Sequence, residues 1–229
     1  MFARIIEDAP TFFTYYNGLL LMEAMAATFM LSAVGCVIGF GAGFFLAVAR
    51  RTTSLGLLPL RVSTFGFVEA FRRIPFLVTL MLVFFVFEIV KIDISLFSVA
   101  LISVCLIATA FIAEIIRGGL ESVHQTQWDT AAAMNFSLAQ TLIYVIMPQA
   151  WKIILPPVFS FFILFIKDTA LASQIGVVEL TYAGKILNNK GFSAALVFGS
   201  VLVLYFVISY PLARFGVWME SRLASSRNR

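Results

Sequence analysis

The sequence is short of charged residues and of the residue types that build metal sites. Of its 229 residues, 12% are charged, about half the share of an ordinary soluble domain. It has one histidine and two cysteines, and Cys36 and Cys105 lie in separate apolar runs without a C-x-x-C spacing. We therefore interpret both cysteines as core residues and His124 as a solvated loop residue, in preference to redox, metal-ligand or general-base roles.

Long apolar runs take the place of the missing charge. Hydrophobic residues make up 61% of the chain, and Glu23 is the only charged residue between positions 18 and 49. A helix that crosses a bilayer needs about 20 apolar residues. The composition thus predicts a membrane protein. It excludes disordered, collagenous and disulfide-rich secreted chains, and also a large soluble catalytic domain, which would have no stretch left to form a core.

Six runs carry almost no charge, and five of them are expected to cross the membrane. The run at 130–151 contains polar residues such as Asn135 and Gln149 and follows a polar stretch. We therefore expect a loop with short amphipathic helices there. The five predicted spans lie within 22–49, 74–87, 94–113, 153–166 and 191–213.

The positions of arginine and lysine predict the orientation. Loops on the cytoplasmic side of a membrane are enriched in these residues. If the N-terminus lies outside, one side receives Arg50, Arg51, Arg61, Arg117, Lys152, Arg222, Arg227 and Arg229. The predicted fold class is an all-α membrane protein with about five transmembrane helices, N-terminus outside and C-terminus cytoplasmic. Because the net charge of +4 is spread among the segment ends, nucleic acid is not an expected partner.

Three local features predict how the helices are arranged. Gly35, Gly39 and Gly43 recur every four residues and should form a packing seam on one face of the first span. Pro75 should break or kink the second span. Residues 1–17 should form an amphipathic arm at the membrane interface rather than a cleaved signal.

Two ion pairs are expected within helices. Glu69 and Arg72 are three residues apart and can pair on one helical face. Glu114 is also three residues before Arg117, so it should pair with this arginine or pack against the loop that follows.

Four motifs in the second half of the chain form a specific pattern. They are AEIIRGGLESV at 113–123, QWDTAAAMNFS at 127–137, MPQA at 147–150 and FIKDTALASQIGVVEL at 165–180. In this order and spacing they resemble the EAA motif and following segments of binding-protein-dependent ABC import permeases, and more narrowly the polar amino acid uptake branch. The resemblance implies one type I ABC importer transmembrane domain over 1–229, with an EAA-type cytoplasmic coupling loop at 118–150.

The resemblance places the contact with the ATPase at Gln127, Trp128, Asp129, Ala131, Ala132 and Asn135. Small alanines let a short helix sit closely in a cleft of a partner, and Trp128 offers a large anchoring surface. We prefer this interpretation to an ordinary alanine-rich connector. Asp129 stands where the family has glutamate and Asn135 where it has glycine, and asparagine tolerates the left-handed conformation that ends a helix. SLAQTLIY replaces the basic residues that usually follow, so the coupling surface should be less cationic.

Polar residues at or near the predicted spans are candidates for the substrate pathway, because an ionisable group in a membrane is costly. Pro75 joins them because a break in the helix frees backbone carbonyls, which need protein or water beside them. The candidates are Glu69, Arg72, Pro75, Lys167, Asp168, Thr169 and Ser173. Lys167 and Asp168 are adjacent and diverge on a helix, so they either face the pathway or join the fourth span to the segment at 176–190. Arg73 either meets an anionic group or is one more charge on the cytoplasmic side.

The resemblance implies a permease subunit of an ATP-driven importer in the bacterial inner membrane, not an enzyme. Two ATP-binding cassette ATPase subunits, a second permease subunit and an extracytoplasmic solute-binding protein would complete it, and the substrate would be a polar amino acid or a derivative. No Walker A sequence occurs, so ATP and Mg would belong to the ATPase and no cofactor is expected here. The amino acid and the choice between identical and paralogous permeases stay open. The alternative is a self-sufficient secondary carrier or channel driven by an ion gradient.

Overall fold

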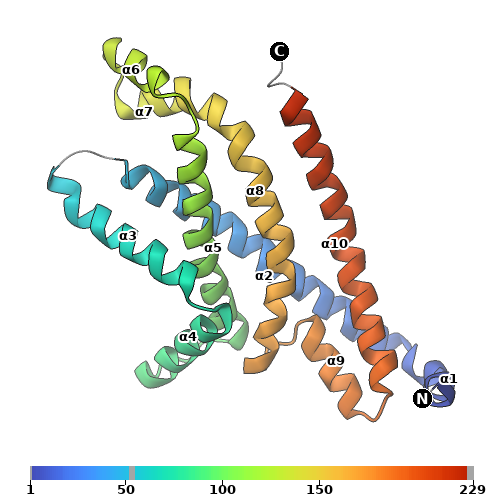
Figure 1. Ribbon diagram of the computed structural model, residues 1–229. Coiled ribbons are helices and arrows are strands. Elements are labelled where there is room, and N and C mark those ends of the chain that lie inside the picture. Colours follow the sequence, from blue (N-terminus) through green and yellow to red (C-terminus); the bar gives the residue numbers. More distant parts are fainter. Residues whose placement is uncertain (1, 52–54, 226–229) are drawn as a thin grey trace.

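The computed structural model describes residues 2–51 and 55–225, and within these ranges every regular element is helical (Figure 1). The elements are α1 (Phe2–Phe12), α2 (Tyr15–Ala49), η1 (Leu55–Leu57), α3 (Leu58–Arg73), α4 (Phe76–Val90), α5 (Leu96–Glu121), α6 (Gln125–Ala133), α7 (Leu138–Gln140), η2 (Thr141–Ile146), α8 (Met147–Asp168), η3 (Thr169–Ile175), α9 (Leu180–Asn189) and α10 (Ala194–Ser225). The chain is therefore an all-α protein over the part that the structure describes.

Four or five of these elements are suited to cross a membrane. Four stretches are long and apolar enough, at Tyr15–Ala49, Leu96–Glu121, Leu138–Ile175 and Ala194–Leu223. The pair α3 and α4 passes the same test when taken together but is bent by 115°. The bend lies at Pro75, as predicted, because α3 ends at Arg73 and α4 begins at Phe76. Figure 1 shows α1 at one end of the bundle and the end of α10 at the other.

The helix of the fourth span begins earlier than the sequence predicted. Two short helices, α6 and α7, do occupy part of 130–151, but from Thr141 a π-helical turn continues directly into α8. The polar residues of this stretch are satisfied locally, which is why they do not end the helix. Gln149 donates from Nε2 to the Val145 carbonyl at 2.8 Å and to Gln127 Oε1 at 3.3 Å.

The glycine seam of the first span is confirmed, and it packs against α5 of the same chain. A Cβ atom at Gly39 would lie 2.6 Å from Ala108 Cβ, and one at Gly43 would lie 2.8 Å from the Ala113 backbone nitrogen. Such distances leave no room for a side chain, so glycine allows the two backbones to approach closely. The seam fixes α2 across α5 at the centre of the bundle (Figure 1).

Two apolar clusters hold the ends of the bundle. At one end, Ile116 and Leu120 of α5 pack with Leu142, Ile146 and Ile154, which ties the turns after α6 to α5 and α8. At the other end, Phe12 of α1 packs with residues of α2, α9 and α10. Asp8 Oδ2 also accepts a hydrogen bond from the Ser193 amide at 2.8 Å, so the arm predicted at 1–17 is held beside the start of α10.

Candidate coupling end and translocation pathway

The EAA-type motif forms α6, a helix of nine residues with a clear start and a clear end. His124 is the N-cap, and its exposed side chain accepts from the Thr126 amide at 3.3 Å. Asn135 has a φ of 56°, the left-handed conformation expected of it. The Phe136 amide then donates to the Ala131 carbonyl at 3.0 Å, which satisfies an otherwise free carbonyl at the helix end. These two residues define a short, rigid helix.

One face of α6 is exposed at the end of the molecule (Figure 1). Asp129 and Ala132, three residues apart, share this face, and Gln127 and the residue after the helix end, Asn135, are exposed as well, whereas Ala131 is buried. Asp129 Oδ1 accepts from Gln125 Nε2 at 3.0 Å, so its carboxylate is held along the helix surface. Met134, 63% exposed, adds an apolar group to the same end. Small and apolar groups next to one carboxylate make a surface that another helix or a shallow cleft can cover.

Trp128 is the residue of the motif that fixes α6 to its own chain. It packs on the apolar cluster of α5 and α8. The Arg51 guanidinium carbon lies 4.0 Å from the centroid of the indole ring, a cation–π contact that joins α6 to the end of α2. Its indole nitrogen is buried and has no hydrogen-bond partner among the residues described. Sequence reasoning did not identify the role of Arg51, because 77 positions separate it from Trp128 along the chain.

Three helices meet at Glu114 through arginine side chains. Its carboxylate lies 2.6 Å from Arg117 Nη2, 3.2 Å from Arg50 Nη1 and 3.4 Å from Arg72 Nη1. The pair with Arg117 confirms the sequence prediction. Arg50 ends α2 and Arg72 is in the last turn of α3, so one carboxylate of α5 joins all three elements.

The expected pair of Glu69 and Arg72 is the weaker of two. These side chains approach to 3.9 Å, whereas Glu69 Oε2 lies 2.7 Å from Arg73 Nη2. Arg72 is closer to Glu114, at 3.4 Å. The reason is geometric. Spacings of three and of four residues both place a cation beside Glu69, and Glu114 of α5 draws Arg72 away from it. Arg73 is thus half of an exposed intrahelical pair in this structure.

The remaining pathway candidates lie at the end of α8, near the bend at Pro75. The ring of Phe76 packs against that of Phe165, with centroids 5.4 Å apart. Lys167 is exposed and contributes to a cavity of about 460 Å³ between α8 and α10, and Asp168 is half-buried. Within the described residues no hydrogen bond or ion pair joins the Glu69 and Arg72 group to the Lys167 and Asp168 group.

The buried polar residues after α8 connect elements of this chain. Thr169 Oγ1 donates to the Ile166 carbonyl at 2.7 Å. Ser173 Oγ accepts from Lys185 Nζ at 3.0 Å. The connection between the fourth span and the segment at 176–190 is thus made by Ser173 and Lys185. Neither the Lys167 nor the Asp168 side chain forms a hydrogen bond or ion pair with a residue that the structure places.

Glu179 is a buried carboxyl that sequence reasoning missed. It is 0% exposed and caps α9, accepting from the Thr181 and Tyr182 amides at 2.9 and 2.8 Å and from the Tyr205 hydroxyl at 2.9 Å. Burial raises the pKa of the Glu179 carboxyl above its usual range, against the lowering effect of these donors. An acidic residue directly before an amphipathic run, as in ELTYAGKI, is the signal for such a cap.

Comparison with known proteins agrees with this geometry. Residues 39–225 match the family described as the binding-protein-dependent transport system inner membrane component. The L-cystine transport system permease protein TcyB of Bacillus subtilis is 32% identical, over 86% of this chain and 83% of its own. The glutamine transport system permease protein GlnP of Escherichia coli K12 is also 32% identical, over 85% of this chain and 88% of its own.

Solved structures show the same fold. The crystal structure of an amino acid ABC transporter with histidines superposes with a TM-score of 0.81 at 26% identity, over 90% of this chain and 94% of that one. An inward-facing MetNI methionine ABC transporter superposes with a TM-score of 0.76 at 23% identity, over 92% and 99% of the two chains. This chain therefore belongs to the binding-protein-dependent transport system inner membrane components, and it is a multi-pass permease subunit of an ATP-binding cassette importer rather than an enzyme.

Proposed function

We propose that this permease imports a polar amino acid or a close derivative, delivered by an extracytoplasmic solute-binding protein. The support is the similarity to permeases named for glutamine and L-cystine, which extends over most of each chain. The arginine-rich end of the bundle, which carries Arg50, Arg61 and Arg117, then faces the cytoplasm with the C-terminus, because cytoplasmic ends of spans are enriched in cations.

The exposed face of α6 couples the permease to its ATPase. The observation that carries this proposal is the arrangement of Asp129 and Ala132 on a short helix, with Asn135 just after its end, whose other side is held by Ala131 and Trp128. A helix fixed in this way transmits a push from a partner to α5 and α8. ATP and Mg bind to the ATPase, and this chain supplies no cofactor site.

In the complete importer, two permease subunits form the pore and two ATPase subunits drive it. Closure of the ATPase pair moves α6 together with the apolar cluster of α5 and α8, and so alternates the pore between its two access states. Lys167 and Asp168, at the end of α8 beside the bend at Pro75, are the charges of this chain that meet the substrate. Their lack of ion-pair partners among the described residues leaves them available to an ammonium or a carboxylate.

A double substitution tests the coupling. Asp129→Arg with Ala132→Glu replaces the small acidic surface of α6 by a bulky one of altered charge, and we expect it to abolish uptake while the subunit still inserts in the membrane. The matched control is Glu220→Arg, a charge reversal at an exposed position of α10, near the end of the bundle that carries α6 (Figure 1). The control should keep normal uptake. Normal uptake by the double variant would remove α6 from the coupling role.

A further inference from the structure

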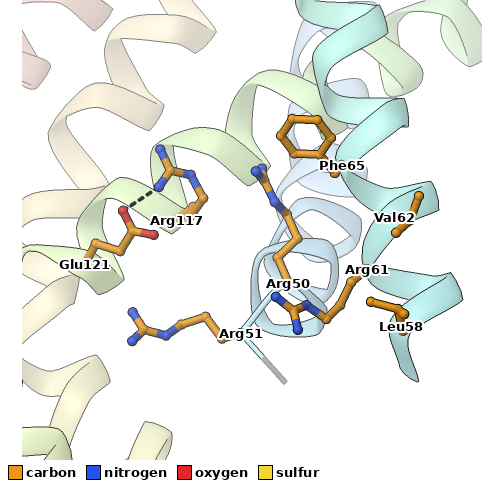
Figure 2. Close-up of a pocket in the computed structure, with 8 residues that line it drawn as sticks. All are labelled: Arg50, Arg51, Leu58, Arg61, Val62, Phe65, Arg117 and Glu121. Carbon is orange, nitrogen blue, oxygen red and sulfur yellow. Dashed lines mark hydrogen bonds and ion pairs between the residues drawn. The ribbon is translucent and has the colours of Figure 1, made fainter. Parts of the chain in front are cut away.

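A cavity of about 340 Å³ lies at the arginine-rich end of the bundle, between the ends of α2, α3 and α5 (Figure 2). Its lining includes four arginines: Arg50 and Arg51 from the end of α2, Arg61 from α3, and Arg117 from α5. Figure 2 shows these side chains extending from three separate helices around one space. The bundle itself, rather than a single helix face, brings the cations together.

Protein carboxylates balance only part of this positive charge. Arg50 and Arg117 both contact Glu114, and Arg117 also pairs with Glu121. Arg51 stacks on Trp128 instead of pairing with a carboxylate. The Arg61 side chain forms no hydrogen bond or ion pair with any residue in 2–51 or 55–225. Four guanidinium groups therefore share two carboxylates, which leaves a site that attracts an anion.

The opposite wall of the cavity is apolar and faces outward. Leu58, Val62 and Phe65 of α3 line it and are 48%, 63% and 53% exposed. They recur at spacings of four and three residues, so they lie on one face of α3. A carboxylate of a docking protein would need only the arginines and would leave this apolar wall without a partner. An apolar wall beside a cationic cavity, at the ends of membrane spans, fits a ligand with an anionic head and hydrocarbon chains.

We propose that this cavity binds the phosphate headgroup of an anionic phospholipid from the leaflet on the arginine-rich side. The guanidinium groups of Arg51 and Arg61 contact the phosphate oxygens, for which the planar donor fork of arginine is well matched. The acyl chains lie along Leu58, Val62 and Phe65. Because Arg51 also stacks on Trp128, the bound lipid supports the junction between α2 and α6.

The test measures lipid binding to the purified full importer by native mass spectrometry, with phosphatidylglycerol and phosphatidylcholine as probes. Arg61→Gln removes the cation that has no protein partner, and we expect it to weaken phosphatidylglycerol binding by about fivefold. Arg61→Lys keeps the charge but not the planar donor fork, and it should weaken the binding less than Arg61→Gln does. The matched control is Arg214→Gln, an exposed arginine of α10 outside the cavity, which should leave binding unchanged.

Three outcomes would overturn the proposal. The first is equal phosphatidylglycerol binding by the wild type and Arg61→Gln, and the second is equal binding of phosphatidylcholine and phosphatidylglycerol. If the first outcome comes with reduced retention of the ATPase by Arg61→Gln, the cavity is assigned to a protein partner. The third outcome concerns free phosphate. Displacement of the lipid by excess inorganic phosphate would instead assign it to free phosphate, whereas we expect the lipid to stay because the apolar wall holds its chains.

Discussion

At the scale of single residues, the sequence does not distinguish Glu114 from the other carboxylates of this permease, but the structure does. Glu114 is an ordinary-looking acid three residues before an arginine, yet it collects Arg50, Arg72 and Arg117 from three helices. Its side chain is 20% exposed, against 50% for Glu121, about two turns further along α5. The more enclosed carboxylate therefore carries more of the connection between α2, α3 and α5.

Removing this carboxylate should destabilise the fold more than removing its neighbour. Glu114→Gln removes the carboxylate that three arginines share and leaves Arg50 without a carboxylate partner among the described residues, and we expect a loss of about 1–2 kcal/mol in the free energy of unfolding. Glu121→Gln should change it by less than about 0.5 kcal/mol, because its pair is largely solvated. Thermal unfolding in detergent measures both variants. Equal unfolding midpoints for the two variants would contradict the role of Glu114 in connecting α2, α3 and α5.

Glu179 predicts a dependence of stability on pH. Burial raises the pKa of this carboxyl above its ordinary value of 4.5, so the folded state retains the proton more strongly than the unfolded state. This contribution to stability is complete below the unfolded pKa and is lost as the pH rises through the folded pKa. Glu179→Gln keeps an uncharged acceptor at the N-cap. Between the unfolded and the folded pKa of Glu179, the stability of this variant should fall less with rising pH than that of the wild type.

The measurement is the difference in unfolding midpoint between wild type and Glu179→Gln as the pH rises from the acidic side of 4.5. Glu220→Gln, at an exposed position of α10, is the control and should follow the wild type. A difference that stays constant with pH would show that Glu179 does not titrate between the two states.

At the scale of elements, the packing of α2 across α5 depends on the absence of side chains at three positions. A Cβ at Gly43 would meet backbone atoms of α5, whereas one at Gly41 would meet no atom within 4 Å. We expect Gly43→Val to destabilise the fold by about 1–3 kcal/mol through overpacking. Gly41→Val, on the opposite face, should cost far less. Unfolding midpoints in detergent compare the two, and similar losses would show that valine propensity rather than packing is responsible.

The elements also show which features the sequence can predict. The bend at Pro75, the left-handed Asn135 and the glycine face of α2 follow from local chemistry, and all three occur. The pairs of Glu114 with Arg50 and Arg72 do not follow from it, because their partners are 64 and 42 positions away in the sequence. The long helix into α8 was also missed, since polar side chains such as Gln149 indicate a loop until their local hydrogen-bond partners are known.

At the scale of the whole molecule, the two ends of the bundle have different constructions. One end carries α6, Glu114 and the cationic cavity, and the other carries α1, α9 and the buried Glu179. The first end is connected by ion pairs and cation–π contacts among α2, α3, α5 and α6. A partner that moves α6 would therefore act on all of these elements together, as the proposed coupling requires.

The central claim is that the energy for transport comes from a separate ATPase acting through α6. The most direct measurement is uptake of labelled polar amino acids into proteoliposomes that contain the importer purified from its host, with the solute-binding protein added on the substrate side. We predict uptake only when ATP is present on the side of α6, and none in the Asp129→Arg, Ala132→Glu variant. Uptake by this chain alone without ATP, driven by an ion gradient, would contradict the account.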